Sequence, residues 1–284
     1  MLLAIAAGLT ATATAAPAAV ASGPRFSIRP VTYNPAVPAT QSYFIFDSRP
    51  GAVVQTELKV ANVGNAAGTV LLYPVDATTG QTSGTVYRPR TARRSDVGAW
   101  LRLSMRRLKL AAGETRIVPF EFAVPTRVRS GQHVGGIVAE NATRPTGSTA
   151  GSQNTGSSFT IKLRFLSIVA VVVKLPGPVV EQVAVTGVST DYVPTYQRLR
   201  LGLRNQGNML EKPLATLTVA NGAGTNVFRR KIQLDTILPR TAIAYPVYLR
   251  RRPLPAGRYR ATVELRYGHG RHERFADWFR VGSR

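Results

Sequence analysis

The chain has 284 residues, of which 44% are hydrophobic and 18% charged, so it is long enough to bury a core in one large or two ordinary domains and is not a disordered chain. Its 37 Lys and Arg against 14 Asp and Glu leave a net charge of +23, which indicates an anionic partner such as nucleic acid, a membrane surface or a wall polymer. The absence of cysteine excludes disulfides, thiol catalysis, thiolate metal sites and iron–sulfur clusters.

Residues 1–21 have the pattern of an export signal. A short apolar segment is followed by an Ala- and Thr-rich stretch and by Ala19-Val20-Ala21, which fits the small residues before a cleavage site. The segment lacks the Lys or Arg that normally precedes the apolar part. No later apolar run approaches the roughly 20 residues needed to span a membrane. We therefore expect an exported protein, extracellular or at the cell wall or surface, with no transmembrane anchor in this chain.

Apolar and polar residues alternate with a period of two from Phe26 onward, which predicts half-buried strands. Clear examples are residues 53–62 and 115–124. Pro119 lies on the polar side of the second of these, so an edge strand or a bulge is expected there. A short helix is expected between residues 91 and 99.

The polar stretch 141–158 lies between two apolar runs, at residues 132–140 and 158–173. It has the composition of a linker, but we interpret it as the lengthened tip of a hairpin formed by these runs, since extending a surface loop costs little entropy. The domain boundary is placed instead at residues 175–178, which gives domains of 24–176 and 177–282.

The two halves share a layout. Each has an Asn-and-Gly turn after an alternating strand, at residues 62–65 and 205–208, and a Gly turn before a long strand, at residues 110–114 and 254–258. The predicted fold class is all-β, with two tandem immunoglobulin-like antiparallel β-sandwich domains. The shared layout has two possible explanations: the halves are a duplicated unit, or they share what any two sandwiches have in common.

The chain lacks the residues that most classes of enzyme need for catalysis. The three histidines are His133, expected to be partly exposed at the start of a strand, and His269 and His272, expected in a hairpin loop. None stands in a zinc or hydrolase motif, and no calcium or phosphate-binding loop occurs. A pair of carboxylates could still meet in space, as in a glycosidase, but the sequence gives no sign of one. We predict no enzyme, no cofactor and no metal.

Residues 26–176 resemble the peptidoglycan-binding domain of WxL-interacting proteins. The elements that carry the resemblance are Tyr43 to Phe46, the Pro50-Gly51 turn, the Asn62 turn, DATTG at 76–80, Trp100, the Gly113-Glu114 turn, Val124-Pro125 and Gly131 with Gly135-Gly136. The resemblance implies a surface protein of Gram-positive bacteria whose first domain binds peptidoglycan and whose second binds a host or partner protein. Residues 180–281 are similar in layout to that second domain. Family members usually finish with a transmembrane helix and a basic tail, whereas this chain finishes with FRVGSR.

Seven residues of the first domain are candidates for ligand binding. Tyr43, Tyr87 and Trp100 have rings that could stack on a sugar, although a Trp leading into a sandwich strand is also typical of the core; Arg88, Arg93, Arg94 and Arg102 could bind carboxylates or phosphates through paired hydrogen bonds.

The leading hypothesis is a secreted, non-enzymatic envelope protein that binds peptidoglycan or an associated anionic wall polymer with its first domain. Its second domain would bind another surface protein, such as a WxL-domain protein or a host protein, and no small-molecule substrate is expected. One alternative is a two-domain envelope chaperone of the pilus-assembly type that holds a client on an edge strand. A basic nucleic-acid-binding protein is a second alternative, which requires the export signal to be misread; the Lys and Arg residues are spread over nearly every strand rather than gathered in a recognised motif.

Overall fold

The computed structural model describes residues 23–143, 149–151, 158–160, 165–193, 196–249 and 253–282. The expected export signal, residues 1–21, lies outside them. Over the described residues the chain is almost entirely strand, and helix is confined to two single turns, η1 (Pro38–Gln41) and α1 (Val97–Trp100). The all-β prediction is confirmed, and the helix expected between residues 91 and 99 is present only as the short α1.

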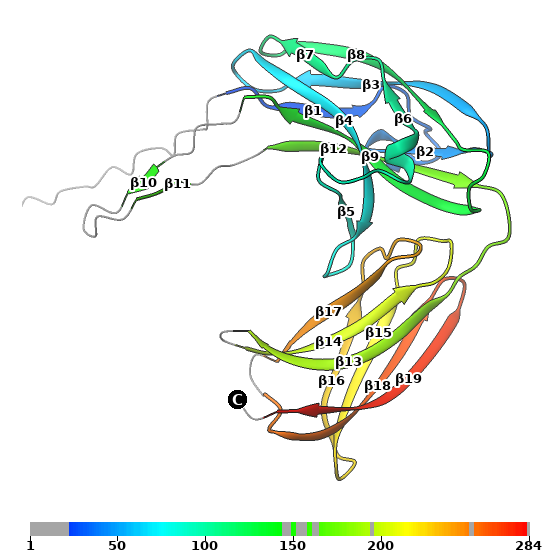
Figure 1. The fold of residues 1–284 in the computed structure, drawn as a ribbon, viewed down its shortest axis with the longest axis vertical. Coiled ribbons are helices and arrows are strands. Elements are labelled where there is room, and N and C mark those ends of the chain that lie inside the picture. The colour runs from blue at the N-terminus through cyan, green and yellow to red at the C-terminus, as the bar shows by residue number, and fades with distance from the viewer. Residues whose placement is uncertain are drawn as a thin grey trace, which may run out of the picture.

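The N-terminal sandwich, residues 26–175, is built from two facing sheets (Figure 1). The first sheet has the order β1-β3-β8-β6, and its strands are β1 (Phe26–Pro30), β3 (Val53–Asn62), β8 (Thr115–Ala123) and β6 (Leu101–Leu103). The second has the order β2-β12-β9-β4-β5 with β7 also on β4; these strands are β2 (Phe44–Asp47), β12 (Leu166–Leu175), β9 (Gly131–Asn141), β4 (Gly68–Thr79), β5 (Thr85–Tyr87) and β7 (Arg107–Leu110). All described pairings are antiparallel except that of β2 with β12.

The C-terminal sandwich, residues 183–281, has a three-stranded and a four-stranded sheet. The first contains β13 (Val183–Val193), β14 (Tyr196–Asn205) and β17 (Ala242–Leu249), and the second contains β16 (Asn226–Gln233), β15 (Leu214–Asn221), β18 (Gly257–Tyr267) and β19 (Arg271–Val281). Each sandwich has its own cluster of buried apolar side chains.

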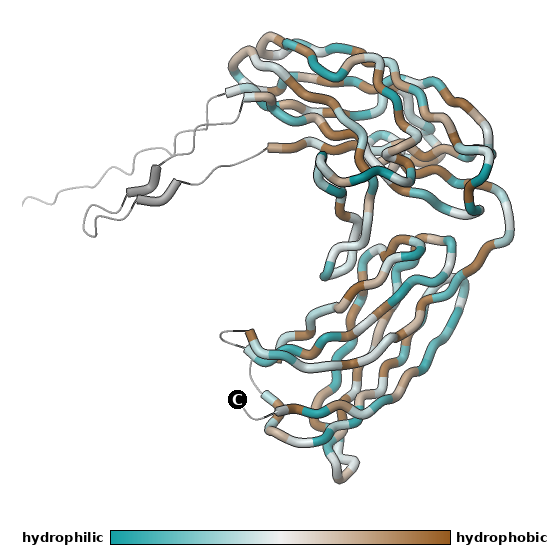
Figure 2. The backbone as a smooth tube through the Cα atoms, viewed as in Figure 1, coloured by the Kyte–Doolittle hydropathy of each residue, from teal (hydrophilic) through white to brown (hydrophobic). Residues whose placement is uncertain are grey.

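The alternating pattern of the sequence explains both cores. In β8, Val118, Phe120 and Phe122 are buried, whereas residues between them face outward. Figure 2 shows brown and teal alternating along many strands of both sandwiches. Rings from the facing sheet complete the core, with Phe44 meeting Phe120 edge-on at a centroid distance of 5.1 Å. The hydrophobic effect therefore fixes the register of each strand against its neighbours, because a shift of one residue would turn its apolar side chains toward water.

The strands on either side of the polar stretch lie side by side. β9 pairs with β12 without interruption, from Gly131 opposite Leu175 to Glu140 opposite Leu166. Between them a small ladder joins β10 (Thr149–Gly151) to β11 (Ser158–Thr160). The rest of the expected loop, residues 144–148 and 152–157, lies outside the described residues.

The edge-strand prediction for Pro119 is wrong for β8 as a whole, since this strand lies between β3 and β6. β6 is only three residues long and pairs with Phe120 to Phe122, so it ends one position before Pro119. Proline has no N–H to donate, and here it sits where the neighbouring strand has already stopped.

The two sandwiches contact each other at two places. The β4–β5 hairpin reaches the C-terminal sandwich, where Gly84 N–H donates to Thr236 O at 2.9 Å and the Thr79 and Thr241 hydroxyls lie 2.6 Å apart. At the start of β9, Gln132 N–H donates to the carbonyl of Asn208 at 2.8 Å. A hollow remains between these contacts, and the overall shape is curved, with β5 and β12 facing the C-terminal sandwich (Figure 1).

Candidate functional site

A buried carboxylate holds the basic segment 88–96 against the N-terminal sandwich. Asp76, near the end of β4, is 4% exposed and accepts N–H groups from Ser95 at 2.6 Å, Asp96 at 3.2 Å and Gly98 at 2.8 Å. Gly98 allows this approach, because a Cβ at that position would lie 2.5 Å from the Val75 carbonyl carbon. The segment is thus fixed by its backbone, and its arginines project from a defined support.

Four arginines surround a surface hollow of about 490 Å³ beside that segment, which we call the arginine hollow. Its lining residues are Leu72, Tyr73, Pro74, Arg90, Arg94, Ala99, Leu101, Arg102, Leu103 and Arg106. The Arg90 guanidinium lies over the Tyr73 ring, 5.1 Å from its centroid, and the Tyr73 hydroxyl donates to Glu140 Oε2 at 2.8 Å. The hollow therefore carries a high local positive charge above an apolar floor.

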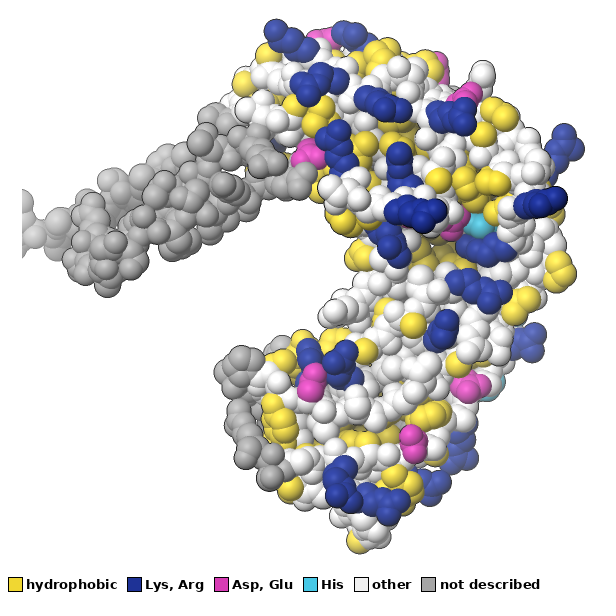
Figure 3. Space-filling model, in the orientation of Figure 1, with side chains coloured by type: hydrophobic (Ala, Val, Ile, Leu, Met, Phe, Trp, Pro, Cys, Tyr) yellow, Lys and Arg dark blue, Asp and Glu magenta, His cyan; other side chains and the backbone are white. Residues whose placement is uncertain are grey.

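Little of that charge is neutralised by the protein. Arg102 Nη1 lies 4.0 Å from Glu121 Oε1, and its side chain is 74% exposed, so this ion pair is weak. Among the described residues, no carboxylate forms an ion pair with Arg90, Arg94 or Arg106. Figure 3 shows Lys and Arg side chains distributed over the visible face of both sandwiches, with far fewer Asp and Glu.

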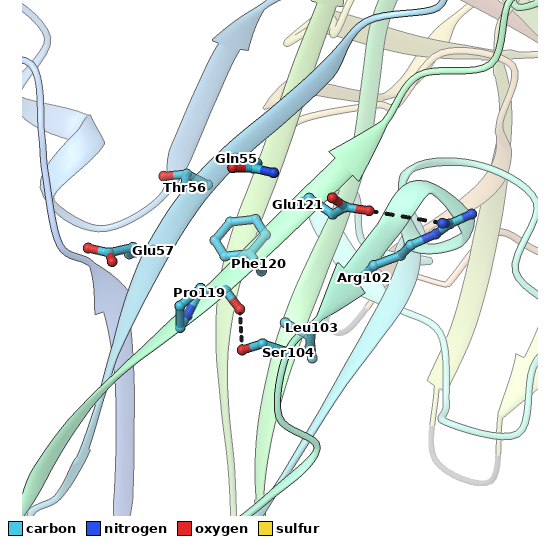
Figure 4. Close-up of a pocket in the computed structure, with 9 residues that line it drawn as sticks. All are labelled: Gln55, Thr56, Glu57, Arg102, Leu103, Ser104, Pro119, Phe120 and Glu121. Carbon is cyan, nitrogen blue, oxygen red and sulfur yellow. Dashed lines mark hydrogen bonds and ion pairs between the residues drawn. The ribbon is translucent and has the colours of Figure 1, made fainter.

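A second hollow, of about 620 Å³, lies on the other side of β6, and we call it the polar hollow. Figure 4 shows its lining residues, which are Gln55, Thr56, Glu57, Arg102, Leu103, Ser104, Pro119, Phe120 and Glu121. It is present because β6 stops at Leu103 while β3 and β8 continue; Ser104 Oγ then donates to the Pro119 carbonyl at 2.7 Å.

Amide, carboxylate and hydroxyl groups line the polar hollow, whereas Phe120 is 3% exposed and its ring packs in the core beneath it. Convergent polar groups are typical of sugar sites, because they bind hydroxyl groups. Arg102 and Leu103 line both hollows, so the polar and arginine hollows adjoin each other across β6.

A third hollow, the interdomain cleft, has a volume of about 650 Å³. Its N-terminal lining comes from β2, β5, β9 and β12, and its C-terminal lining from loops of the other sandwich; the residues are Tyr43, Ile45, Thr85, Tyr87, Gln132, Val134, Ala170, Val172, Lys174, Glu181, Met209, Leu210, Glu211, Lys212, Thr236, Gly268 and His269. Burial raises the pKa of Tyr87 to about 12. The Tyr87 ring lies close to Gly136 of β9, where a Cβ would approach it to 2.7 Å.

The structure divides the seven predicted ligand-binding residues among several places. It brings Arg94 and Arg102 together in the arginine hollow, whereas Tyr43 and Tyr87 line the interdomain cleft. Arg88 and Arg93 are exposed and line none of the three hollows. The seven residues therefore do not share one hollow.

Trp100 and His133 need correction. Trp100 is 5% exposed and its ring lies 4.8 Å from that of His133, so it is a core residue and offers no ring face to a ligand. His133 is 2% exposed rather than partly exposed; its Nδ1 lies 2.6 Å from Asp96 Oδ1 and its Nε2 lies 3.1 Å from Arg129 O. Trp100 is the last residue of α1, and the His133 ring packs against it.

Sequence reasoning missed Tyr73, Arg90 and Arg106. Arg90 belongs to the dense basic stretch RPRTARR, so the sequence did carry a signal for it. Arg106 lies outside that stretch, and only the folded chain brings it to the same hollow as Arg90. Within the described ranges, no three His, Asp or Glu side chains are arranged to hold a metal ion. None of the helices in the described part of the chain is long and apolar enough to cross a membrane.

Residues 26–141 match the family model described as WxL Interacting Protein, peptidoglycan binding domain. The match covers less than half of the chain, and the similarity is a property of this part alone. The resemblance stated for residues 26–176 is thereby confirmed over residues 26–141, which contain the arginine and polar hollows. No curated protein sequence gives a significant match to the chain.

Several solved structures are similar in their strand arrangement. The class 5 fimbriae chaperone CfaA has 10% identity and a TM-score of 0.38, with 90% of this chain and 99% of that chain covered. The E. coli chaperone DraB has 13% identity and a TM-score of 0.34, with 92% and 97% covered. A PapD-like domain of human CEP192 has 11% identity and a TM-score of 0.32, with 60% and 99% covered. At these scores the similarities carry no argument about function.

Proposed function

We propose that the protein is an exported, non-enzymatic component of a cell envelope whose N-terminal sandwich binds peptidoglycan. The match of residues 26–141 to a peptidoglycan-binding family is the observation that carries this proposal. The polar hollow supports it, because its amide, hydroxyl and carboxylate groups are the kind that hydrogen-bond to sugar hydroxyls.

Sedimentation with purified sacculi tests the proposal. Protein beginning at Ser22 is mixed with sacculi stripped of anionic secondary polymers, and the bound fraction is measured at low and high salt. Binding should persist at high salt, and replacing Gln55 and Glu57 by Ala should weaken it about ten-fold, the effect of losing roughly 1.4 kcal/mol.

The matched control replaces another exposed amide and carboxylate, Asn226→Ala with Glu264→Ala in the C-terminal sandwich. This control should bind stripped sacculi like the unaltered protein. Failure of the unaltered protein to sediment with stripped sacculi at any salt concentration would overturn the proposal.

The C-terminal sandwich is the part of the chain that we assign to a protein partner. Large aromatic side chains are exposed on it, among them Tyr248 at 37% and Trp278 at 43%. Aromatic residues are enriched at protein interfaces, where they supply much of the binding energy. Once a partner is isolated, Trp278→Ala should weaken its binding, whereas Glu264→Ala should not.

A second candidate function is that of a chaperone that holds an extended client segment on the edge of β12. β2 pairs with only Val171 to Lys174 of β12, so residues 166–170 have β9 as their sole partner among the described strands. Phe165 and Leu166, at the open end of this edge, are about half exposed. An apolar edge strand is a template for an added strand.

Hydrogen exchange distinguishes this candidate from the first. A synthetic peptide of alternating Val and Ser should slow exchange of the β12 amides at residues 166–170 if a client segment adds to this edge. Unchanged exchange at saturating peptide concentration would exclude the chaperone function and leave peptidoglycan binding unaffected.

A further inference from the structure

We propose that the arginine hollow is a separate anion-binding subsite that takes the phosphodiester groups of an envelope polymer. This inference rests on the proposed function for the location of the protein and for the neighbouring sugar site. It adds a ligand chemistry, phosphodiester, and assigns it to Arg90, Arg94, Arg102 and Arg106.

The charge balance of the hollow is the first argument. Four guanidinium groups line one depression of about 490 Å³, and the single ion pair that any of them makes among the described residues is the 4.0 Å contact between Arg102 and Glu121. Like charges gathered around one hollow repel one another, and bound anions relieve this repulsion. Anions from outside the chain are therefore the natural occupants.

The support of the arginines is the second argument. Arg90 and Arg94 stand on the segment that Asp76 fixes through three backbone N–H groups, and Arg102 stands on β6. Arg90 is further held over the Tyr73 ring. Side chains on a fixed support lose less entropy when they bind an anion, and this raises their affinity.

The number of charges favours phosphodiester over a lone carboxylate. One carboxylate would neutralise a quarter of the four guanidinium charges, whereas a polymer brings an anionic group with every repeat. The non-bridging oxygens of each phosphodiester match the two parallel donors of a guanidinium group. Because Arg102 also lines the polar hollow, a sugar bound there and a phosphodiester bound here would lie side by side.

Nucleic acid carries the same phosphodiester groups, but the hollow lacks what single strands need. Their bases stack on exposed aromatic rings. The only aromatic side chain in the lining is Tyr73, whose ring is covered by Arg90 and whose hydroxyl donates to Glu140. A polymer without bases is therefore the better fit.

Binding to a poly(glycerol phosphate) chain tests the inference directly. Affinity is measured by titration over a salt series for the unaltered protein and for a variant with Arg90, Arg94 and Arg106 all replaced by Gln. The variant should lose about ten-fold or more in affinity, and the slope of log affinity against log salt should fall by roughly two to three, since each lost phosphate contact removes about one unit.

Two further variants separate the site from overall charge. Replacing Arg229, Arg230 and Lys231 of β16 by Gln removes the same charge from the C-terminal sandwich and should have a much smaller effect. Replacing the three hollow arginines by Lys keeps the charge but removes the paired donors, so it should give an intermediate loss. Equal losses in the β16 and hollow variants would overturn the inference.

Competitors and stripped sacculi complete the experiment. Polyglutamate or oligothymidine that binds the hollow as tightly as poly(glycerol phosphate) would overturn the assignment to a base-free phosphodiester. Stripped sacculi report on the sugar site alone, and the hollow variant should still bind them. Loss of polymer binding with retained sacculus binding therefore supports the inference, whereas failure to bind stripped sacculi contradicts only the proposed function.

Discussion

Asn62 and Asn205 make equivalent hydrogen bonds in the two sandwiches. Both are fully buried, and the side-chain amide of each donates to carbonyls of two separate loops, such as Ala66 O and Ala111 O for Asn62. The Oδ1 atom of each accepts the N–H of the glycine two residues later. Each Asn thus satisfies loop backbone groups that are shielded from water, and so fixes the turn that follows its strand.

Replacing either Asn by Ala should lower the free energy of unfolding of its sandwich by about 2 to 4 kcal/mol, because several buried backbone groups lose their partner. Denaturant unfolding followed by a probe in each sandwich measures the loss. The control is Asn226→Ala on the exposed face of β16. A loss no larger than that of the control would show that the network contributes little.

Glu211 gives a prediction about pH. It is 3% exposed, and its pKa is raised because burial disfavours the charged form and Glu181 adds repulsion, while the Gly268 N–H and His269 oppose the shift. Arg271 lies 4.0 Å from Glu181, and Lys212 lines the same cleft as Glu181 and Glu211.

A raised pKa means that the folded protein holds this proton more tightly than the unfolded chain. The free energy of unfolding should therefore fall as pH rises from about 4.5, the ordinary Glu value, through the folded pKa. Glu211→Gln should remove that part of the fall, and Glu264→Gln on the exposed face of β18 should not. Parallel pH curves for the unaltered protein and Glu211→Gln would contradict this reasoning.

Among the structural elements, the position of the segment 88–96 is the feature that the sequence predicted least. Its density of arginine was evident, and so was the presence of an acidic residue at position 76, but nothing in the sequence joins the two. The bonds from Asp76 to Ser95 and Gly98 exist only because the β4–β5 hairpin brings the chain back beside Asp76. Local alternation predicted the strands well, because it depends on neighbouring residues alone.

Asp76→Asn separates geometry from charge. The substitution makes the protein more positive, yet it places an amide group against backbone N–H donors, so the segment should loosen. Affinity for poly(glycerol phosphate) should fall, and trypsin should cut at residues 88–94 more rapidly. An affinity that rises with the added charge would show that the fixed support of Arg90 and Arg94 is unimportant.

At the scale of the whole molecule, the sequence predicted the two sandwiches and the β9–β12 hairpin, but it did not predict how the sandwiches meet. Tyr43 and Tyr87, two of the candidate ligand-binding residues, line the interdomain cleft, which the sequence did not predict. The contacts that form this cleft join residues far apart in the chain, such as Gln132 with Asn208. No periodicity encodes such a contact, since it depends on the path of the whole chain.

Gly131 is the tightest point of that contact. Its φ is +96°, and a Cβ there would lie 2.3 Å from Asn208 O. Gly131→Ala should force the sandwiches apart and raise the radius of gyration measured by X-ray scattering, with both cores intact. Gly113→Ala is the control, because it has a φ of +76° but no atom within 4 Å of the added Cβ. An unchanged radius of gyration would mean that the strain is absorbed locally.

The shortness of β6 has a consequence for how binding could diversify. The polar hollow exists because β6 ends at Leu103 and no described strand pairs with β8 beyond it on that side. It does not depend on small side chains. Lengthening this one strand would add a ladder partner for β8 and fill the hollow, whereas shortening it would merge the hollow with its arginine-lined neighbour. Insertions and deletions at a single turn would therefore change ligand size, and the buried faces of the sandwich would not have to change.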